Sequence, residues 1–323
     1  MLLPCLAMQT SPHNKQILLG IAIILFSILF SSPAVAQPVR AGFLYTLANF
    51  TGPIKRDFSR VAVDMARTEI YVLYQNNVTV FNDAGMEVYR FGDDLDLGQL
   101  VDVAVDEEGD VLLLSYKESR WAIIRCNFRG EPKSQVELGN LPRTFSNFSP
   151  NRMIYRGGSY YLASTIGMRL VVADRQGTFK KGYDLVSLFD LEEKDRENTE
   201  VFGFDVDREG NILLTVPVLF RVYILSPDGK LNYFGQPGGA PGRFNIVAGV
   251  VRDSQGNYLV VDKLKCSVSV FDKNFKYITQ FGTRGYKPGN LIAPEWIAID
   301  SRDRVYVTQL GRRGVSAYNL SHN

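Results

Sequence analysis

A short motif that recurs along the chain constrains the fold more than any other feature of the sequence. The motif begins with an apolar residue, any residue, a second apolar residue and an aspartate. A polar turn follows, which in most copies contains glycine, and then an apolar run. Copies begin at Val61, Val103, Met153, Phe204, Val250 and Ile297, of which the copy at Met153 is degenerate. Because aspartate bonds its own backbone in turns and glycine accepts a positive φ, each copy predicts a β-hairpin.

The stretch from Phe234 to Gly282 displays the complete repeating unit. Four short runs of β-branched and aromatic residues are separated by turn residues, and these runs are Val247–Val251, Tyr258–Val261, Val268–Phe271 and Tyr277–Phe281. Such a pattern predicts four strands in an antiparallel meander. Six copies of a four-stranded unit predict an all-β fold, a six-bladed β-propeller of four-stranded antiparallel blades.

The repeat also predicts where the blades lie and how the ring closes. We expect blades at about residues 58–98, 99–142, 143–200, 201–245, 246–292 and 293–323. The last blade is one strand short, and residues 43–53 resemble Tyr277–Gly282, so the N-terminal strand Phe43–Phe50 is expected to complete it. This closure would remove the exposed sheet edges.

Residues 1–36 have the features of a secretory signal peptide. Lys15 precedes the apolar run Ile17–Phe30, and Ala34-Val-Ala36 forms a cleavage site before Gln37. The apolar run is short for a membrane span of ~20 residues. We therefore expect cleavage, no stable membrane insertion afterwards, and a periplasmic or secreted propeller of residues 37–323; a retained membrane anchor is the alternative.

The composition argues against several kinds of chemistry. The net charge of +2 gives no basic excess for binding nucleic acid. His13 and His322 are the only histidines, so a zinc site or a histidine-based catalytic dyad is not expected. Outside the leader, Cys126 and Cys266 fall in opposite blades, and we expect them to be free, buried thiols. We expect no catalytic residues, no metal site and no cofactor.

Two blades carry motifs of a known family. These are Gly239-Ala-Pro-Gly-Arg-Phe-Asn245 with Tyr258–Asp262, and Lys287-Pro-Gly289 with Trp296–Asp300. On these motifs, residues 43–323 resemble the NHL-repeat β-propellers, of the exported bacterial type. The aspartate that ends the second strand in family repeats is present only as Asp262.

The resemblance implies two functions. Related propellers include lactonases and lyases that hold histidine, zinc or calcium at the ring centre, so a calcium-dependent hydrolase, lactonase or lyase is the alternative function. Exported proteins of this type accompany bacterial envelope and electron-transfer systems, which implies a non-catalytic scaffold for an envelope or redox protein.

One face of the predicted propeller is the candidate site for such a partner. Loops that follow the second and fourth strands of each blade share this face, and there blades four to six place Arg243, Lys263, Lys265, Arg284, Tyr286, Lys287, Arg312 and Arg313. The acidic segments Asp93–Asp96 and Glu192–Glu200 fall on the same face. Basic and acidic sectors can orient a charged protein partner; solvated loop charges are the alternative.

The leader is directly testable. N-terminal sequencing of the exported protein should find Gln37 as the first residue, because the cleavage site ends at Ala36. An exported protein that still carries the apolar run would show instead that the segment serves as an anchor.

Overall fold

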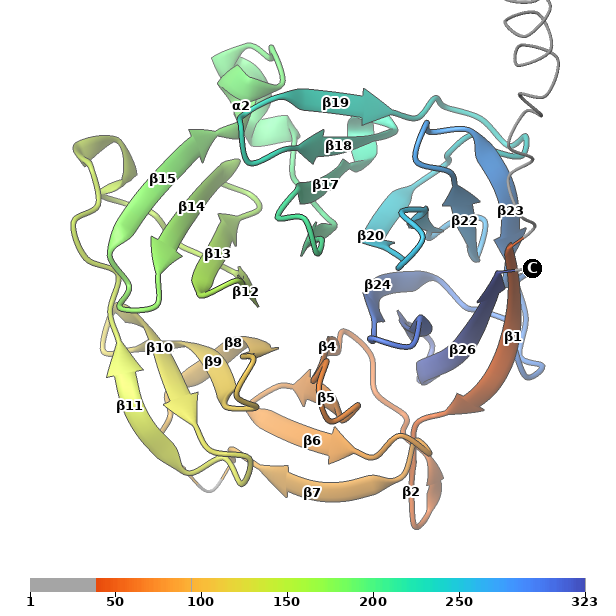
Figure 1. Ribbon diagram of the computed structural model, residues 1–323, viewed down its shortest axis with the longest axis horizontal. Coiled ribbons are helices and arrows are strands. Elements are labelled where there is room, and N and C mark those ends of the chain that lie inside the picture. The colour runs from red at the N-terminus through yellow and green to blue at the C-terminus, as the bar shows by residue number, and fades with distance from the viewer. Residues whose placement is uncertain (1–38, 94, 323) are drawn as a thin grey trace, which may run out of the picture. The chain divides into compact units, whose positions relative to one another are not determined.

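The computed structural model describes residues 39–93 and 95–322, which form a ring of six four-stranded antiparallel sheets (Figure 1). The predicted signal peptide, 1–36, lies outside the described residues. Among the residues that are described, no helix is long and apolar enough to cross a membrane. The predicted six-bladed β-propeller is therefore confirmed, and its blades follow one another around the ring in chain order.

Each of the first five blades is a meander of four consecutive strands. Blades one and two contain β4 (Arg60–Val63), β5 (Ile70–Tyr74), β6 (Asn77–Phe81), β7 (Glu87–Phe91), β8 (Gln99–Val105), β9 (Val111–Lys117), β10 (Arg120–Cys126) and β11 (Pro132–Val136). Blades three and four contain β12 (Arg152–Arg156), β13 (Ser159–Ser164), β14 (Arg169–Asp174), β15 (Phe179–Asp184), β16 (Phe204–Val206), β17 (Ile212–Val216), β18 (Arg221–Leu225) and β19 (Leu231–Phe234). Blade five contains β20 (Val247–Arg252), β21 (Tyr258–Asp262), β22 (Ser267–Phe271) and β23 (Tyr277–Phe281).

Blade six combines the two ends of the described chain. Its strands are β24 (Pro294–Ile299), β25 (Arg304–Gln309), β26 (Gly314–His322) and, from the N-terminal side, β1 (Val39–Thr46). β1 pairs antiparallel with β26, with Val39 opposite His322 and Phe43 opposite Tyr318. The rings of Phe43 and Tyr318 meet edge to face, with centroids 5.8 Å apart. Closure by the N-terminal strand is thus confirmed.

The bounds of the closing strand differ from the prediction. The strand begins earlier, at Val39, and ends at Thr46 instead of Phe50. The chain then turns into a separate two-stranded ribbon, β2 (Ala48–Asn49) and β3 (Gly52–Pro53), because Asn49 accepts the Thr51 amide and Gly52 takes a positive φ. The resemblance to Tyr277–Gly282 therefore located the strand but not its ends.

Short helices decorate the linkers between strands. They are η1 (Arg143–Phe145), α2 (Leu185–Leu188), η2 (Glu193–Asn198) and η3 (Pro217–Leu219). Two of them, α2 and η2, lie in the linker between blades three and four. Arg196 of η2 pairs with Glu193 at 2.6 Å and with Asp184 at 2.7 Å.

The aspartates of the recurring motif hold the hairpins, as expected. Asp253 Oδ1 accepts the amides of Gln255 and Asn257 at 2.9 and 2.7 Å, and Asp300 Oδ1 accepts those of Arg302 and Arg304, both at 2.8 Å. Equivalent bonds form at Asp64, Asp106 and Asp207. These side chains satisfy turn amides that would otherwise lack partners.

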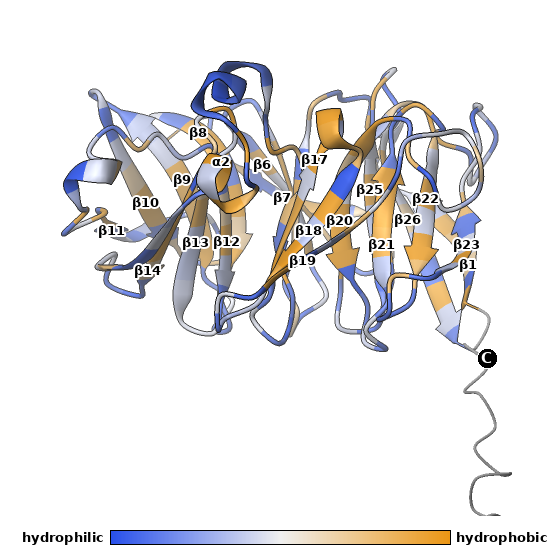
Figure 2. Cartoon of the chain, turned by 90° about the horizontal axis from the view of Figure 1, so that it is seen from above, coloured by the Kyte–Doolittle hydropathy of each residue, from blue (hydrophilic) through white to orange (hydrophobic). Residues whose placement is uncertain are grey.

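The core is divided among the contacts between blades. Across the described residues, six apolar clusters each join two neighbouring blades. The cluster between blades six and one joins Tyr306 and Val315 to Ile70 and Val72, all fully buried. Figure 2 shows the result: apolar strands lie between hydrophilic loops at both ends. Cys126 and Cys266 are free and buried in these clusters, as predicted.

Removal of β1 tests ring closure. Deletion of residues 39–46 uncovers Tyr318 and Leu320 and leaves β26 as an open edge. We expect a loss of about 4 kcal/mol or more in the free energy of unfolding, in the range of the most damaging local changes, together with self-association. Leu44→Ala is the control, because Leu44 is 42% exposed. Thermal melting and size-exclusion chromatography measure both effects. A deletion variant that melts like the parent and stays monomeric would contradict closure.

Candidate functional site

The predicted basic residues lie on one face of the ring. We define the loop face as the segments that follow the second and fourth strands of each blade. All eight predicted residues lie in such segments: Arg243 between β19 and β20, Lys263 and Lys265 between β21 and β22, Arg284, Tyr286 and Lys287 between β23 and β24, and Arg312 and Arg313 between β25 and β26. Partner binding by these residues stays a prediction.

Contacts among these residues join the loops of blades five and six. Lys265 Nζ donates to the carbonyl oxygens of Ala240 and Arg243, at 3.0 and 2.6 Å. The Arg284 guanidinium donates to the Leu264 carbonyl oxygen at 2.9 Å. The guanidinium of Arg313 lies 5.7 Å from the ring centroid of Tyr286. These bonds fix the loops while Arg243, Arg284, Tyr286, Lys287 and Arg312 stay exposed.

Lys263 differs from the other predicted residues. Its Nζ pairs with Glu295 at 2.5 Å and lies 5.8 Å from the Phe202 ring, so it reaches across to blade six. Glu295 is 5% exposed and directly precedes Trp296 at the ring centre. Lys263 is therefore neutralised within the fold and contributes little charge to the loop face.

The loop face also exposes large apolar side chains, which the sequence analysis did not identify. Phe58 and Tyr286 are 72% and 70% exposed in linkers that follow a fourth strand, and Ile166 is 70% exposed between β13 and β14. Further exposed apolar residues on this face are Val218, Ile246 and Leu264. Exposed aromatic and apolar side chains together with arginine are typical of protein interfaces.

A cavity of about 470 Å³ occupies the ring centre, lined by residues of the innermost strands. Carboxylates contribute to its lining, and so do four arginines: Arg60, Arg152, Arg156 and Arg208. Aliphatic walls come from residues such as Val103, Val251 and Ile297. A purely acidic centre would favour the calcium-dependent enzyme, and an apolar channel would argue against it. The cavity is neither, so its lining does not decide between the enzyme and the non-catalytic scaffold.

One repeat position supplies much of this polar lining. It is the residue directly before the recurring motif, and its occupants in blades one to six are Arg60, Asp102, Arg152, Gly203, Gly249 and Trp296. In blades two, five and six the first strand is irregular around this position, as in a β-bulge, which redirects side chains. A Cβ at Gly203 would lie 2.4 Å from the Ala248 carbonyl oxygen, so a side chain does not fit there. An alignment of the six repeats would have identified the residues at this position as candidates for the ring centre.

Two arginines of this set contact one indole. The guanidinium carbons of Arg60 and Arg152 lie 3.9 and 4.2 Å from Trp296 ring centroids. Phe202 stacks on the same indole with a centroid distance of 4.8 Å and an interplanar angle of 10°. We call Arg60 and Arg152 the arginine pair. Blades one, three and six thus meet at Trp296.

Two carboxylates also face the cavity, of which Asp102 is buried and Asp205 partly buried. Asp102 accepts the amides of Val103 and Met153 at 3.0 and 2.9 Å, and burial raises its pKa despite the opposing charges of the arginine pair. Burial raises the pKa of Asp205 to about 7, and the nearby Arg156 only partly offsets this effect. Desolvation is the common cause, because it disfavours the ionised form.

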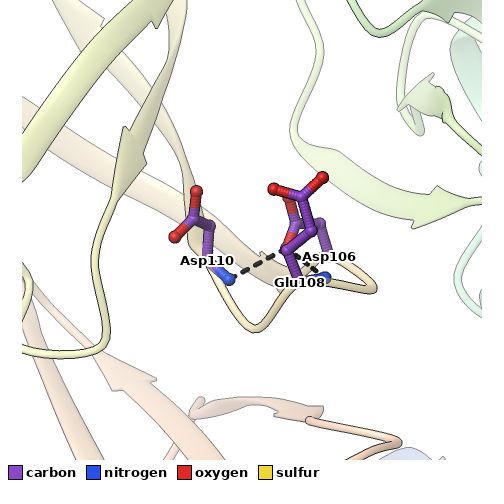
Figure 3. A group of neighbouring side chains, drawn as sticks. All are labelled: Asp106, Glu108 and Asp110. Carbon is purple, nitrogen blue, oxygen red and sulfur yellow. Dashed lines mark hydrogen bonds between the residues drawn. The ribbon is translucent and has the colours of Figure 1, made fainter.

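A cluster of three carboxylates lies in the hairpin between β8 and β9. Figure 3 shows Asp106, Glu108 and Asp110, with Asp106 accepting the amides of the other two. The cluster is already neutralised: Arg125 contacts Asp106, and Lys133 pairs with Asp110 at 2.7 Å. Arg175 pairs with Glu108 at 2.6 Å. Each carboxylate is thus paired with a basic side chain, so we interpret the cluster as part of an ion-pair network.

Comparisons with known proteins agree with the fold. A family model described as a 6-bladed beta-propeller matches residues 243–323. No curated protein matches the sequence. Among solved structures, virginiamycin B lyase from Staphylococcus aureus is 10% identical with a TM-score of 0.57, covering 88% of this chain and 100% of that one.

Two other solved structures are similar to the same extent. A gluconolactonase from Xanthomonas campestris is 14% identical with a TM-score of 0.54, covering 90% of this chain and 94% of that one. An auxiliary nutrient binding protein from Bacteroides ovatus is 13% identical with a TM-score of 0.59, covering 88% and 78%. At these identities the similarity shows the fold alone: the chain is a six-bladed β-propeller.

The shifted pKa of Asp205 makes stability depend on pH. The folded protein keeps the Asp205 proton up to about pH 7, whereas the ordinary aspartate value is 3.8. As pH rises through this window the unfolded chain ionises first, so the folded state loses stability. Asp205→Asn should therefore raise Tm at pH 8, by ~2 °C for each kcal/mol regained, and change it much less at pH 4.5, near the start of this window. An equal shift at both pH values would contradict this assignment.

Proposed function

We propose that the chain is an exported, non-catalytic binding propeller of the NHL type that docks an acidic protein partner on its loop face. The observation that carries this proposal is the sector of blades five and six where exposed basic residues surround exposed Tyr286 and Leu264. A surface that combines arginine, tyrosine and apolar side chains has the composition of a protein interface.

The charges of this sector favour an acidic partner. Among the described residues, the side-chain nitrogens of Arg243, Arg284, Lys287 and Arg312 have no carboxylate oxygen within 4.0 Å, although the Arg312 backbone amide donates to Asp57 at 2.6 Å. Lys263, in contrast, is paired with Glu295. Unpaired exposed cations attract a partner of opposite charge, and their attraction weakens as salt rises. The acidic linker that contains η2 lies on the same face and would repel such a partner, which orients it toward blades five and six.

The positions of the ionisable residues support binding rather than catalysis. A solved structure of virginiamycin B lyase from Staphylococcus aureus carries a histidine-to-alanine change and is described as catalytically inactive. Among the described residues of this chain the only histidine is His322, which lies 3.4 Å from Asp303 and 3.6 Å from Asp253 between blades five and six. It does not line the central cavity.

A binding function is stated in the name of one of the similar proteins. The protein from Bacteroides ovatus is called an auxiliary nutrient binding protein. A binding protein with a similar fold is consistent with the proposal. The predicted leader would deliver this chain to the same side of the membrane as an envelope partner.

Charge reversal on the loop face tests the proposal. The exported protein is used to capture partners from envelope extract, beside a triple variant, Arg284→Glu, Lys287→Glu and Arg312→Glu. We expect the recovery of a specific partner to fall at least tenfold, ~1.4 kcal/mol, and to fall also for the parent protein as salt rises.

A matched control carries the same change of charge on the opposite face. Arg129→Glu, Lys273→Glu and Lys276→Glu alter exposed residues in the hairpins between β10 and β11 and between β22 and β23. Capture by this control should equal that of the parent. A partner that both triple variants retain equally, or that only the control loses, would overturn the assignment of the loop face.

A further inference from the structure

The arginine pair is an unusual arrangement for a protein interior. Arg60 and Arg152 both contact Trp296 and both line the central cavity, so two like charges lie side by side at the ring centre. Burial lowers the pKa of Arg152 to about 9, and the charge of Arg60 contributes to this shift. Burial lowers the pKa of Arg60 as well. Two desolvated cations in contact with one ring destabilise the fold unless an anion compensates them.

No carboxylate of the described residues compensates the pair within ion-pair distance. Neither guanidinium forms an ion pair, and Arg152 Nε is buried without a hydrogen-bond partner. The charge of Asp102 acts on both arginines, but its oxygens accept the amides of Val103 and Met153. Glu295 is engaged by Lys263. Arg152 Nη1 donates to the Asn151 carbonyl oxygen at 2.5 Å, and the described residues leave the other guanidinium donors of the pair available.

The surroundings of the pair have the properties of a small-ligand site. A cavity of about 470 Å³ is in the size range of such sites, which combine apolar walls with a few fixed polar groups. Val103, Val251 and Ile297 supply apolar walls. The indole of Trp296 holds both guanidiniums by cation–π contact, so their orientation is set before a ligand arrives.

We propose that Arg60 and Arg152 bind the oxyanion group of a small ligand in the central cavity. The planar guanidinium fork matches the oxygen geometry of carboxylate, phosphate and sulfate groups. The apolar walls favour a small organic acid, whose carboxylate would meet the arginine pair while its hydrocarbon part contacts the aliphatic lining. Inorganic phosphate or sulfate offers the same oxyanion chemistry. This site is separate from the loop face and does not depend on the partner proposed above.

Trp296 provides a direct reporter of binding. The chain has two tryptophans, and replacement of the other one by Trp121→Phe leaves the fluorescence of Trp296 alone. The protein is titrated with sodium hexanoate, acetate, phosphate and sulfate at constant ionic strength set with sodium chloride. We expect a saturable change in emission with at least one oxyanion, and a higher Tm in its presence. If hexanoate saturates the response at a lower concentration than acetate, the ligand is an organic acid. If only phosphate or sulfate saturates the response, the ligand is an inorganic oxyanion.

Three variants in the same background identify the residues responsible. Arg60→Gln and Arg152→Gln should each weaken binding at least tenfold, while removal of one repelling charge should leave the unliganded protein folded with an equal or higher Tm. Arg129→Gln is the control, because Arg129 is an exposed arginine that lies 5.3 Å from the Phe128 ring in the hairpin between β10 and β11. Absence of a saturable response to all four anions would overturn the proposal, as would an equal response in the parent and in both variants of the pair.

Discussion

The rest of the structure depends on the burial of apolar side chains between neighbouring blades. Each sheet packs one face against the preceding blade and the other against the following blade, so a blade alone would leave both faces in water. The six apolar clusters lie at these contacts, and the cluster between blades six and one completes the circle. Because the hydrophobic contribution grows with the area removed from water, every contact in the ring contributes to stability. The pairing of β1 with β26 is the point where this arrangement is completed.

Packing of the blades around a ring brings polar residues from distant parts of the chain together at its centre. The first strands of all blades meet there, and the residues before the recurring motif approach one another although they lie far apart in the chain. Water is partly excluded, which explains why Asp102 and Asp205 have raised pKa values and the pKa of Arg152 is lowered. Contact with Trp296 stabilises the two guanidiniums but provides no counter-charge. The ring centre is therefore a place where an added anion would be electrostatically favoured.

The loops at the two ends of the blades differ in how they are held. The hairpins that carry the motif aspartates are held by side-chain bonds to turn amides. The loop face instead contains longer linkers, short helices and exposed apolar side chains. Bonds such as that from Lys265 to the Arg243 carbonyl oxygen hold the linkers in place while the basic groups around them remain exposed. A rigid scaffold that carries loops on one face is suited to the presentation of a binding surface.

Local features of the sequence determined the hairpins, the number of blades and the origin of the closing strand. Alternating apolar runs and Asp-containing turns act over a few residues, and their repetition can be counted. The end of β1 at Thr46 and the internal pairing of Lys263 required the structure, because both depend on contacts with another blade. The arginine pair shows this most clearly. Arg60, Arg152 and Trp296 are ordinary residues in three distant repeats, and only closure of the ring brings them together in a desolvated space.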